Sequence, residues 1–188
     1  PLVYALQWPA YVLSGGRSSV GLAVAVWWSG AWLAFIAWLT ARARAPWLGV
    51  LAVVGVAVLA NRVEAANLLL PWNPTLAIVP AVAMVLVAWR VAVGGRRLLP
   101  VLAVTAVWCS GAHLGYVPLA VTMAAAGVVG LLVTTIRRDG RAGLAGLVRP
   151  AVAAAACAGL LLAPMAVDLA IDRGSSNPAT IIDQGRPD

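Results

Sequence analysis

The sequence predicts an all-α protein, a polytopic transmembrane helix bundle with about six spans. Two observations predict this class. Hydrophobic residues make up 63% of the chain and charged residues only 10%, whereas a soluble domain carries about 25% charged residues. The apolar residues also gather in runs that approach or exceed the ~20 residues that a helix needs to cross a bilayer. A chain of this composition cannot cover a water-facing surface, so we expect an integral membrane protein.

Six apolar segments follow one another along the chain. The second is shorter than a bilayer crossing as an apolar run, and it is kept as a span because of the charge distribution described below. The fourth and fifth come from one long run that is interrupted at His113–Pro118. The polar segment 173–188 predicts an external tail. The predicted spans are 19–41, 46–66, 74–93, 98–113, 116–136 and 150–171.

The arginines give the predicted bundle an orientation. The chain carries 13 basic residues, all of them arginine. If all six segments cross, nine of these and a single acid, Asp139, fall on one side. Basic loops remain in the cytoplasm, so this side is predicted to be the inner one. The nine are Arg42, Arg44, Arg90, Arg96, Arg97, Arg137, Arg138, Arg141 and Arg149.

This orientation also explains the net charge of +7 without nucleic acid. No basic stripe is interleaved with aromatic residues, so we expect no nucleic-acid partner. If residues 46–66 did not cross, Arg42 and Arg96 would lie on opposite faces and the charge bias would vanish. The cytoplasmic turns, including Gly94–Arg97, offer only arginines and do not resemble a phosphate-binding loop. We therefore expect any chemistry at the outer face.

Asn61, Glu64 and Asn67 are three residues apart, so they would share one helix face near the end of the second span. A carboxylate at this depth is costly unless it faces protein or water. Glu64 could therefore line a polar cavity that holds a substrate hydroxyl or a cation. The alternative is that Arg62 simply pairs with Glu64 at the membrane interface.

Two further clusters fall on the same predicted face. Asn73 precedes Pro74, which is the order expected where a helix begins, and Asn73 could also contact a ligand. His113, the only histidine, lies with Tyr116 at the break between two spans. Non-helical backbone at membrane depth is tolerated where it is buried in protein or lines a cavity. The alternative is that His113 and Tyr116 belong to an interfacial aromatic belt.

The remaining polar and thiol groups are less informative. Asp168 and Asp172 share a helix face at the outer end of the last span. Together they could bind a divalent cation or act as acid and base, or they could be a solvated helix end. Cys109 and Cys157 lie in apolar runs without metal-ligand spacing, and we assign them no function.

The order of the motifs resembles a known family. Pro-Leu-x-Tyr and Gly-Gly-x-Ser open the chain, Pro71-Trp72-Asn73-Pro74 and His113-Leu114-Gly115-Tyr116-Val117-Pro118 follow, and Gly-x-x-Asn-Pro comes after the last span. This order is similar to that of actinobacterial multispanning glycosyltransferases of the GT-C class, which are related to protein mannosyltransferases and aminoarabinose transferases. The likeness runs through nearly the whole chain, and its specific parts are the PWNP and HLGYVP motifs.

The resemblance implies a bundle of the GT-C kind and an enzyme that works in the lipid bilayer. Such an enzyme moves a sugar from a polyprenyl-phosphate donor to a glycan or lipid acceptor at the outer face. Its catalytic Asp usually lies in a first external loop that this chain does not contain, so we expect a partial chain. The resemblance implies supporting roles in the sugar or phosphate site for Glu64, Asn73, His113, Tyr116 and Arg62. The alternatives are a transporter or channel component and a non-catalytic membrane subunit.

Overall fold

The computed structural model describes residues 9–15, 17–62 and 76–171, and all regular elements within them are helices. The predicted all-α class is confirmed. The helices lie where the sequence predicts spans, with shifts of a few residues at their ends. The α-helices are α2 (Ser18–Arg42), α3 (Pro46–Arg62), α6 (Ile78–Ala92), α7 (Leu99–Ala112), α8 (Val117–Asp139) and α9 (Val148–Ile171). Three short 3₁₀ helices, η1 (Arg96–Leu98), η2 (Leu114–Tyr116) and η3 (Arg141–Leu147), join them.

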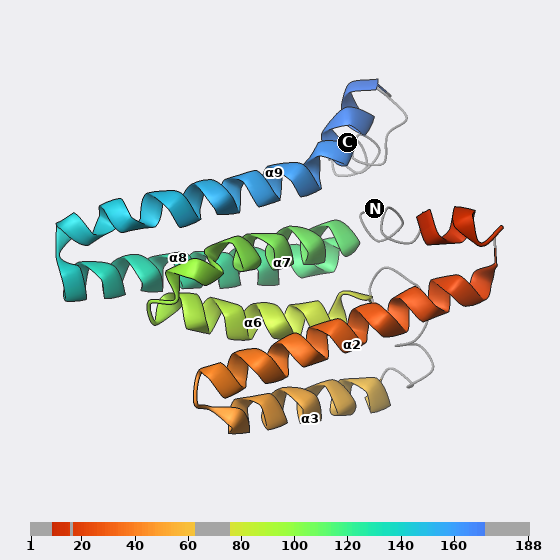
Figure 1. The fold of residues 1–188 in the computed structure, drawn as a ribbon, viewed down its shortest axis with the longest axis horizontal. Helices are drawn as coiled ribbons and strands as arrows, with labels where there is room; N and C mark the ends of the chain where they lie inside the picture. Colours follow the sequence, from red (N-terminus) through yellow and green to blue (C-terminus); the bar gives the residue numbers. More distant parts are fainter. Residues whose placement is uncertain (1–8, 16, 63–75, 172–188) are drawn as a thin grey trace, which may run out of the picture.

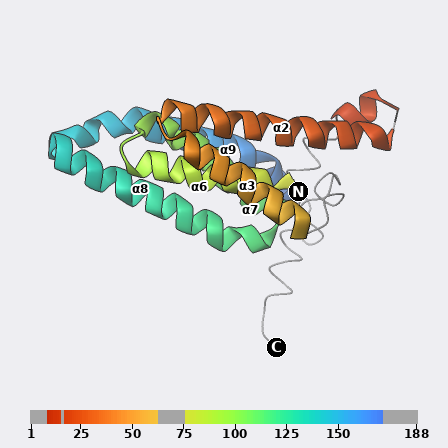
Figure 2. The same cartoon turned by 90° about the horizontal axis from the view of Figure 1, so that it is seen from below.

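The named helices lie roughly along the long axis of the molecule, and each runs opposite to the one before it (Figures 1 and 2). The turns after α2, α6 and α8 consequently lie toward the same end of the bundle, the left of Figure 1. We call this the arginine end, because the nine arginines predicted for the inner side lie in or beside these turns. The opposite end holds the end of α3, the start of α6 and η2, and we call it the His113 end.

Within the described residues, three stretches are long and apolar enough to cross a membrane: Ser19–Arg42, Leu114–Asp139 and Arg141–Pro164. The apolar helices Pro46–Leu59 and Ile78–Ala92 are shorter. Large apolar side chains on the outside of the bundle are widely exposed, such as Trp27 at 68% and Leu160 at 75%. Apolar exposure on this scale is unusual for a monomeric soluble protein, and it fits a lipid environment.

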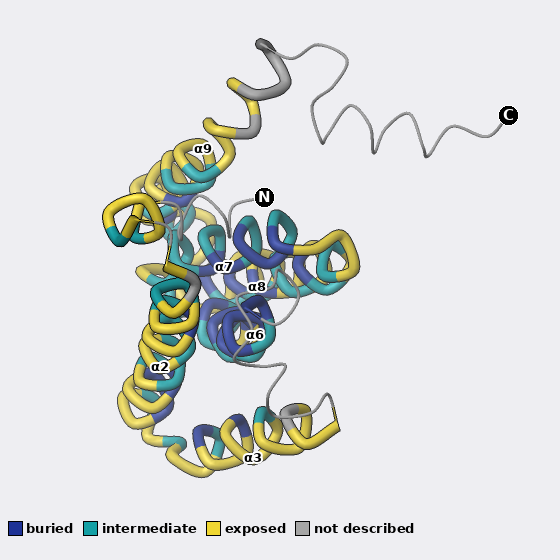
Figure 3. Tube along the Cα trace, turned by 90° about the vertical axis from the view of Figure 1, so that its right-hand side faces the viewer, coloured by how far each residue is buried: buried dark blue, intermediate teal, exposed yellow. Residues whose placement is uncertain are grey.

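Helix α6 packs against α2, α3, α7 and α8, whereas α9 packs against α7. The residues of α2, α3 and α9 are mostly exposed (Figure 3). The side chains of Met84, Val87 and Val91 on α6 are fully buried. They pack with Leu102 of α7 and Leu131 of α8 in one apolar cluster. Helix α6 therefore supplies the buried centre of this cluster.

Helices α6 and α8 approach each other closely through small residues. A Cβ added at Gly130 would lie 2.5 Å from the Cβ of Ala92, and one added at Gly127 would lie 3.4 Å from the Cα of Ala88. The hydroxyl of Thr134 donates a hydrogen bond to the carbonyl oxygen of Ala92 at 2.8 Å. Small residues and hydroxyl groups of this kind are typical of contacts between membrane helices. They fix the end of α6 against α8.

The contact between α6 and α8 positions the turn between α6 and α7. Two positions in this turn require glycine. Gly94 has a φ of +107°, which glycine adopts without the steric cost of a side chain. A Cβ at Gly95 would lie 2.5 Å from the carbonyl oxygen of Arg90. The chain thus reverses within a few residues and presents Arg96 and Arg97 beside the end of α6.

Candidate functional site

The η2 turn at the His113 end is held by local hydrogen bonds. His113 is extended, with φ −159° and ψ 135°, and this conformation ends α7. The Nδ1 atom of His113 accepts a hydrogen bond from the Gly115 amide at 3.0 Å. The Tyr116 amide donates to the carbonyl oxygen of His113, also at 3.0 Å. His113 therefore caps η2, and in its neutral form it carries its proton on Nε2.

Tyr116 connects this turn to the core. It is half-buried and packs against a cluster that α2, α6 and α7 share. The rings of His113 and Tyr116 lie edge to face with their centroids 6.5 Å apart. In the same cluster, Trp28 and Trp108 lie 4.6 Å apart between centroids. The turn thus has a fixed inner side at Tyr116 and an exposed outer side at His113.

An apolar groove of about 430 Å³ lies directly beside the turn, between α7, α8 and α9. Its walls come mainly from small and branched apolar side chains. Leu114 of η2 and Val117 at the start of α8 contribute to it on the side of the turn. The other lining residues are Ala106, Val107, Ser110, Gly111, Ala120, Val121, Ala124 and Leu162. The groove can hold an apolar chain close to His113.

The other residues implied by the resemblance are placed only in part. Arg62 is exposed and ends α3 at the His113 end. Seen along the bundle, α6 lies between α3 and α7 (Figure 3), so Arg62 and His113 belong to different sides of this end. Glu64 and Asn73 lie outside the described residues, as do Asn67 and the tail 173–188.

For the predicted carboxylate pair Asp168 and Asp172, the structure describes only the backbone of the first residue. Residue 168 belongs to α9, and nothing is described of its side chain, whereas Asp172 lies beyond the described residues. Among the described residues, no group of three or more His, Cys, Asp or Glu side chains lies close enough to hold a metal ion.

Sequence reasoning missed the cavities at the arginine end. Two hollows of about 440 and 590 Å³ adjoin the turn that carries Arg96 and Arg97. From the sequence, Arg96 and Arg97 indicate only that their short loop is on the cytoplasmic side. The Gly94-Gly95 pair before them is a local signal of a tight turn, but it does not indicate that α2 borders a hollow on one side of this turn and α9 a hollow on the other.

Comparison of the chain with protein-family models, with curated proteins and with solved structures finds no match. The site is therefore interpreted from its own geometry and from the motifs.

Proposed function

We propose that this chain forms six membrane spans with the arginine end in the cytoplasm, and that it is part of a GT-C class glycosyltransferase. In this proposal the enzyme transfers a sugar from a polyprenyl-phosphate donor to a glycan or lipid acceptor. The transfer takes place at the outer face, which is the His113 end. The donor's phosphate and sugar lie near the η2 turn, and its isoprenoid tail lies in the adjoining groove.

The distribution of charge supports the orientation. The nine arginines all lie at one end of the antiparallel bundle, in or beside the turns after α2, α6 and α8. Arginine-rich loops are retained in the cytoplasm. The described basic residues at the opposite end are Arg17, before α2, and Arg62, at the end of α3. Helices shorter than a full crossing, such as α6, can be accommodated by local thinning of the bilayer or by neighbouring helices.

The observation that carries the donor site is the apolar groove beside the His113 turn. A polyprenyl phosphate combines a long apolar tail with a charged head, so its site needs an apolar channel with polar groups at its mouth. His113 and Tyr116 both supply polar atoms at the turn. Because the Nδ1 atom of His113 accepts from the Gly115 amide, its Nε2–H group can donate a hydrogen bond to a phosphate oxygen.

The remaining implied residues have the roles that the resemblance gives them. Arg62 lies at the end of α3, on the other side of α6 from His113, and in the proposal it can form charge-assisted hydrogen bonds with a phosphate only on that side. Glu64 and Asn73 come from the connection between α3 and α6, whose flanking helices end and begin at the His113 end. In the proposal, they contact hydroxyl groups of the sugar. The resemblance implies an Asp in an external loop as the base that activates the acceptor, and the proposal assigns this role to none of these residues.

The groove can be tested separately from the polar residues. Ala124→Phe would place a ring in the groove, whereas Ala125→Phe would place the same ring on an exposed part of α8 that does not line it. Membranes containing the intact protein would be exposed to a photoreactive polyprenyl phosphate and irradiated. We expect Ala124→Phe to abolish most crosslinking and Ala125→Phe to retain it. Equal crosslinking of both variants would contradict the proposed tail site.

The transfer step is tested with His113→Ala and Glu64→Ala in the intact protein. The measured quantity is the rate of sugar transfer from a radiolabelled polyprenyl-phosphate donor in isolated membranes. We expect each variant to lower the rate by about tenfold or more, which is the scale of losing a charge-assisted hydrogen bond in the transition state. Normal transfer in both variants would overturn the site assignment and favour a membrane subunit without a site of its own.

A further inference from the structure

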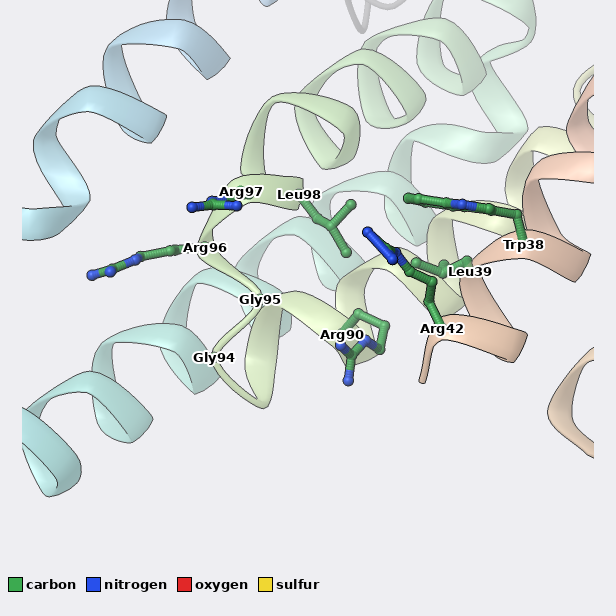
Figure 4. A pocket seen from close by; sticks show the side chains of 9 residues that line it. All are labelled: Trp38, Leu39, Arg42, Arg90, Gly94, Gly95, Arg96, Arg97 and Leu98. Atoms are coloured by element: carbon green, nitrogen blue, oxygen red, sulfur yellow. The ribbon is translucent and has the colours of Figure 1, made fainter. Parts of the chain in front are cut away.

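The cavity of about 440 Å³ at the arginine end lies between α2, α6 and the turn that joins α6 to α7 (Figure 4). Arg42 extends from the end of α2 toward Leu98, and Arg90 lies below it at the end of α6. Arg96 and Arg97 project to the other side of the turn. The cavity is lined by Trp38, Leu39, Arg42, Arg90, Gly94, Gly95, Arg96, Arg97 and Leu98.

The four arginines of this cavity have no anionic partner among the residues that the structure describes. Within the described part of the chain, none of them forms an ion pair or a side-chain hydrogen bond. The Nε of Arg90 is buried and has no hydrogen-bond partner. A buried donor without a partner is costly, and the guanidinium groups of Arg42 and Arg90, which lie on the same side of the turn, repel each other. An anion in the cavity would remove both penalties.

Two of the arginines are held by aromatic rings. The guanidinium carbon of Arg42 lies 5.6 Å from the centroid of the Trp38 ring, and that of Arg90 lies 5.6 Å from the Trp89 ring. Both distances fall within the range of cation–π attraction. These contacts orient the side chains but leave the hydrogen-bond donors free for a ligand.

A second cavity, of about 590 Å³, adjoins the first on the side of α9. It shares Arg96 and Arg97 with the first cavity and adds Arg149. A Cβ added at Gly146 would lie 2.8 Å from an Nη atom of Arg96, so the Arg96 side chain reaches across to η3, just before α9. The two shared arginines therefore stand between two basic hollows, one bordered by α2 and the other by α9.

We propose that the cavity between α2 and α6 binds the phosphate group of an anionic phospholipid from the cytoplasmic leaflet. Guanidinium groups match phosphate oxygens in pairs of hydrogen bonds, and basic pockets between membrane helices are typical sites for anionic headgroups. A lipid fits better than a free phosphate because the wall includes Trp38, which is 51% exposed on the outer side of α2. Trp is enriched at the level of the headgroups. The inference rests on the proposed orientation, but not on transferase activity.

If the nine arginines served only to orient the protein in the membrane, each would contribute equally to lipid binding. If the cavity binds a phosphate group, the arginines that line it contribute more than the others. The chain therefore provides its own control. Arg42→Gln with Arg90→Gln removes two charges from the cavity. Arg137→Gln with Arg141→Gln removes two charges from exposed arginines at the same end, which line neither cavity.

The test measures lipid binding to the full chain in a nonionic detergent. Native mass spectrometry would compare dioleoyl phosphatidylglycerol with dioleoyl phosphatidylcholine at equal concentrations, and inorganic phosphate would be added as a competitor. Wild type should retain one phosphatidylglycerol in preference to phosphatidylcholine. The cavity variant should bind it at least about tenfold more weakly, as expected when a charge-assisted hydrogen bond is lost. The Arg137 and Arg141 variant should stay within about twofold of wild type.

Folding of each variant would be checked by circular dichroism and gel filtration. Arg42→Lys with Arg90→Lys keeps both charges but loses the paired hydrogen-bond geometry, and we expect it to bind with intermediate affinity. Equal binding by the cavity and control variants would overturn the site. Displacement of the lipid by inorganic phosphate at matched concentration would overturn the assignment to a lipid, because the free anion would then be sufficient.

Discussion

The two ends of the bundle are held together in different ways. At the arginine end, the turn after α6 is placed by contact between helices, through Gly130 against Ala92 and through the hydroxyl of Thr134. At the His113 end, the turn after α7 is formed by hydrogen bonds among neighbours in sequence, with His113 as the cap. A disturbance of helix packing should therefore affect the arginine end first, while a local substitution can change the His113 end alone.

The largest effect is expected from a substitution that disturbs the helix packing at the arginine end. Gly130→Ala places a methyl group where Ala92 already lies, and overpacking of this kind typically costs about 1–3 kcal/mol. We expect a lower thermal midpoint of unfolding in detergent, together with weaker lipid retention, because the shifted α6 carries the turn with it.

Gly159→Ala is the matched control, because a Cβ there would meet no atom within 4 Å. Alanine favours a helix over glycine by about 1 kcal/mol, so this variant should be as stable as wild type or more so. A Gly130→Ala protein with an unchanged midpoint would show that the α6–α8 contact does not support the arginine end.

A smaller effect is expected from His113, and it separates two roles of this residue. His113→Ala removes the acceptor for the Gly115 amide and should cost about 1 kcal/mol. His113→Asn should keep most of the stability, because an Asn side chain can accept from the amide two residues further on.

Thermal unfolding of the two His113 variants checks this stability difference, and the transfer assay checks function. If His113 also contacts the donor, both variants lose transfer although only one loses stability. If the rate of sugar transfer falls only in the variant that loses stability, the role of His113 is that of a structural cap alone.

The smallest effect concerns the hydrogen bond between helices. Thr134→Val keeps the shape of the side chain and removes the bond to Ala92, which should cost about 0.6 kcal/mol in a membrane helix pair. Thr122→Val is the control, since the Thr122 hydroxyl donates within its own helix to the carbonyl oxygen of Pro118. The difference between the two thermal midpoints gives the stability that the hydrogen bond between α6 and α8 contributes. An equal fall of the midpoint in both variants would exclude such a contribution.

The same contrast explains what the sequence could reveal. The all-helical class and the break around His113 depend on local patterns: apolar run length, arginine spacing, and Pro118 at the start of α8. The contact between Gly130 and Ala92 joins residues 38 positions apart (130 − 92), and neither segment of the sequence predicts which residue the other contacts. The arginine cavity depends on that pairing and on the approach of α2, so it could not be predicted from the loop alone.

The implied site was predictable only as a set of residues at one end. The prediction grouped His113 with Tyr116 because they are close in sequence, and the structure shows their rings in contact range. The groove beside them requires α7, α8 and Leu162 of α9 together, which is again a nonlocal arrangement. The roles of Glu64, Asn73 and Arg62 stay predictions.

The most direct test of the central claim asks which end of the bundle faces the cytoplasm. Cys109 and Cys157 would be replaced by alanine, and a single cysteine introduced as His113→Cys or Arg141→Cys, both at exposed positions. Intact cells would be treated with a membrane-impermeant maleimide before and after permeabilisation. We expect labelling of His113→Cys in intact cells and of Arg141→Cys only after permeabilisation. Labelling of Arg141→Cys in intact cells would contradict the orientation on which both proposals rest.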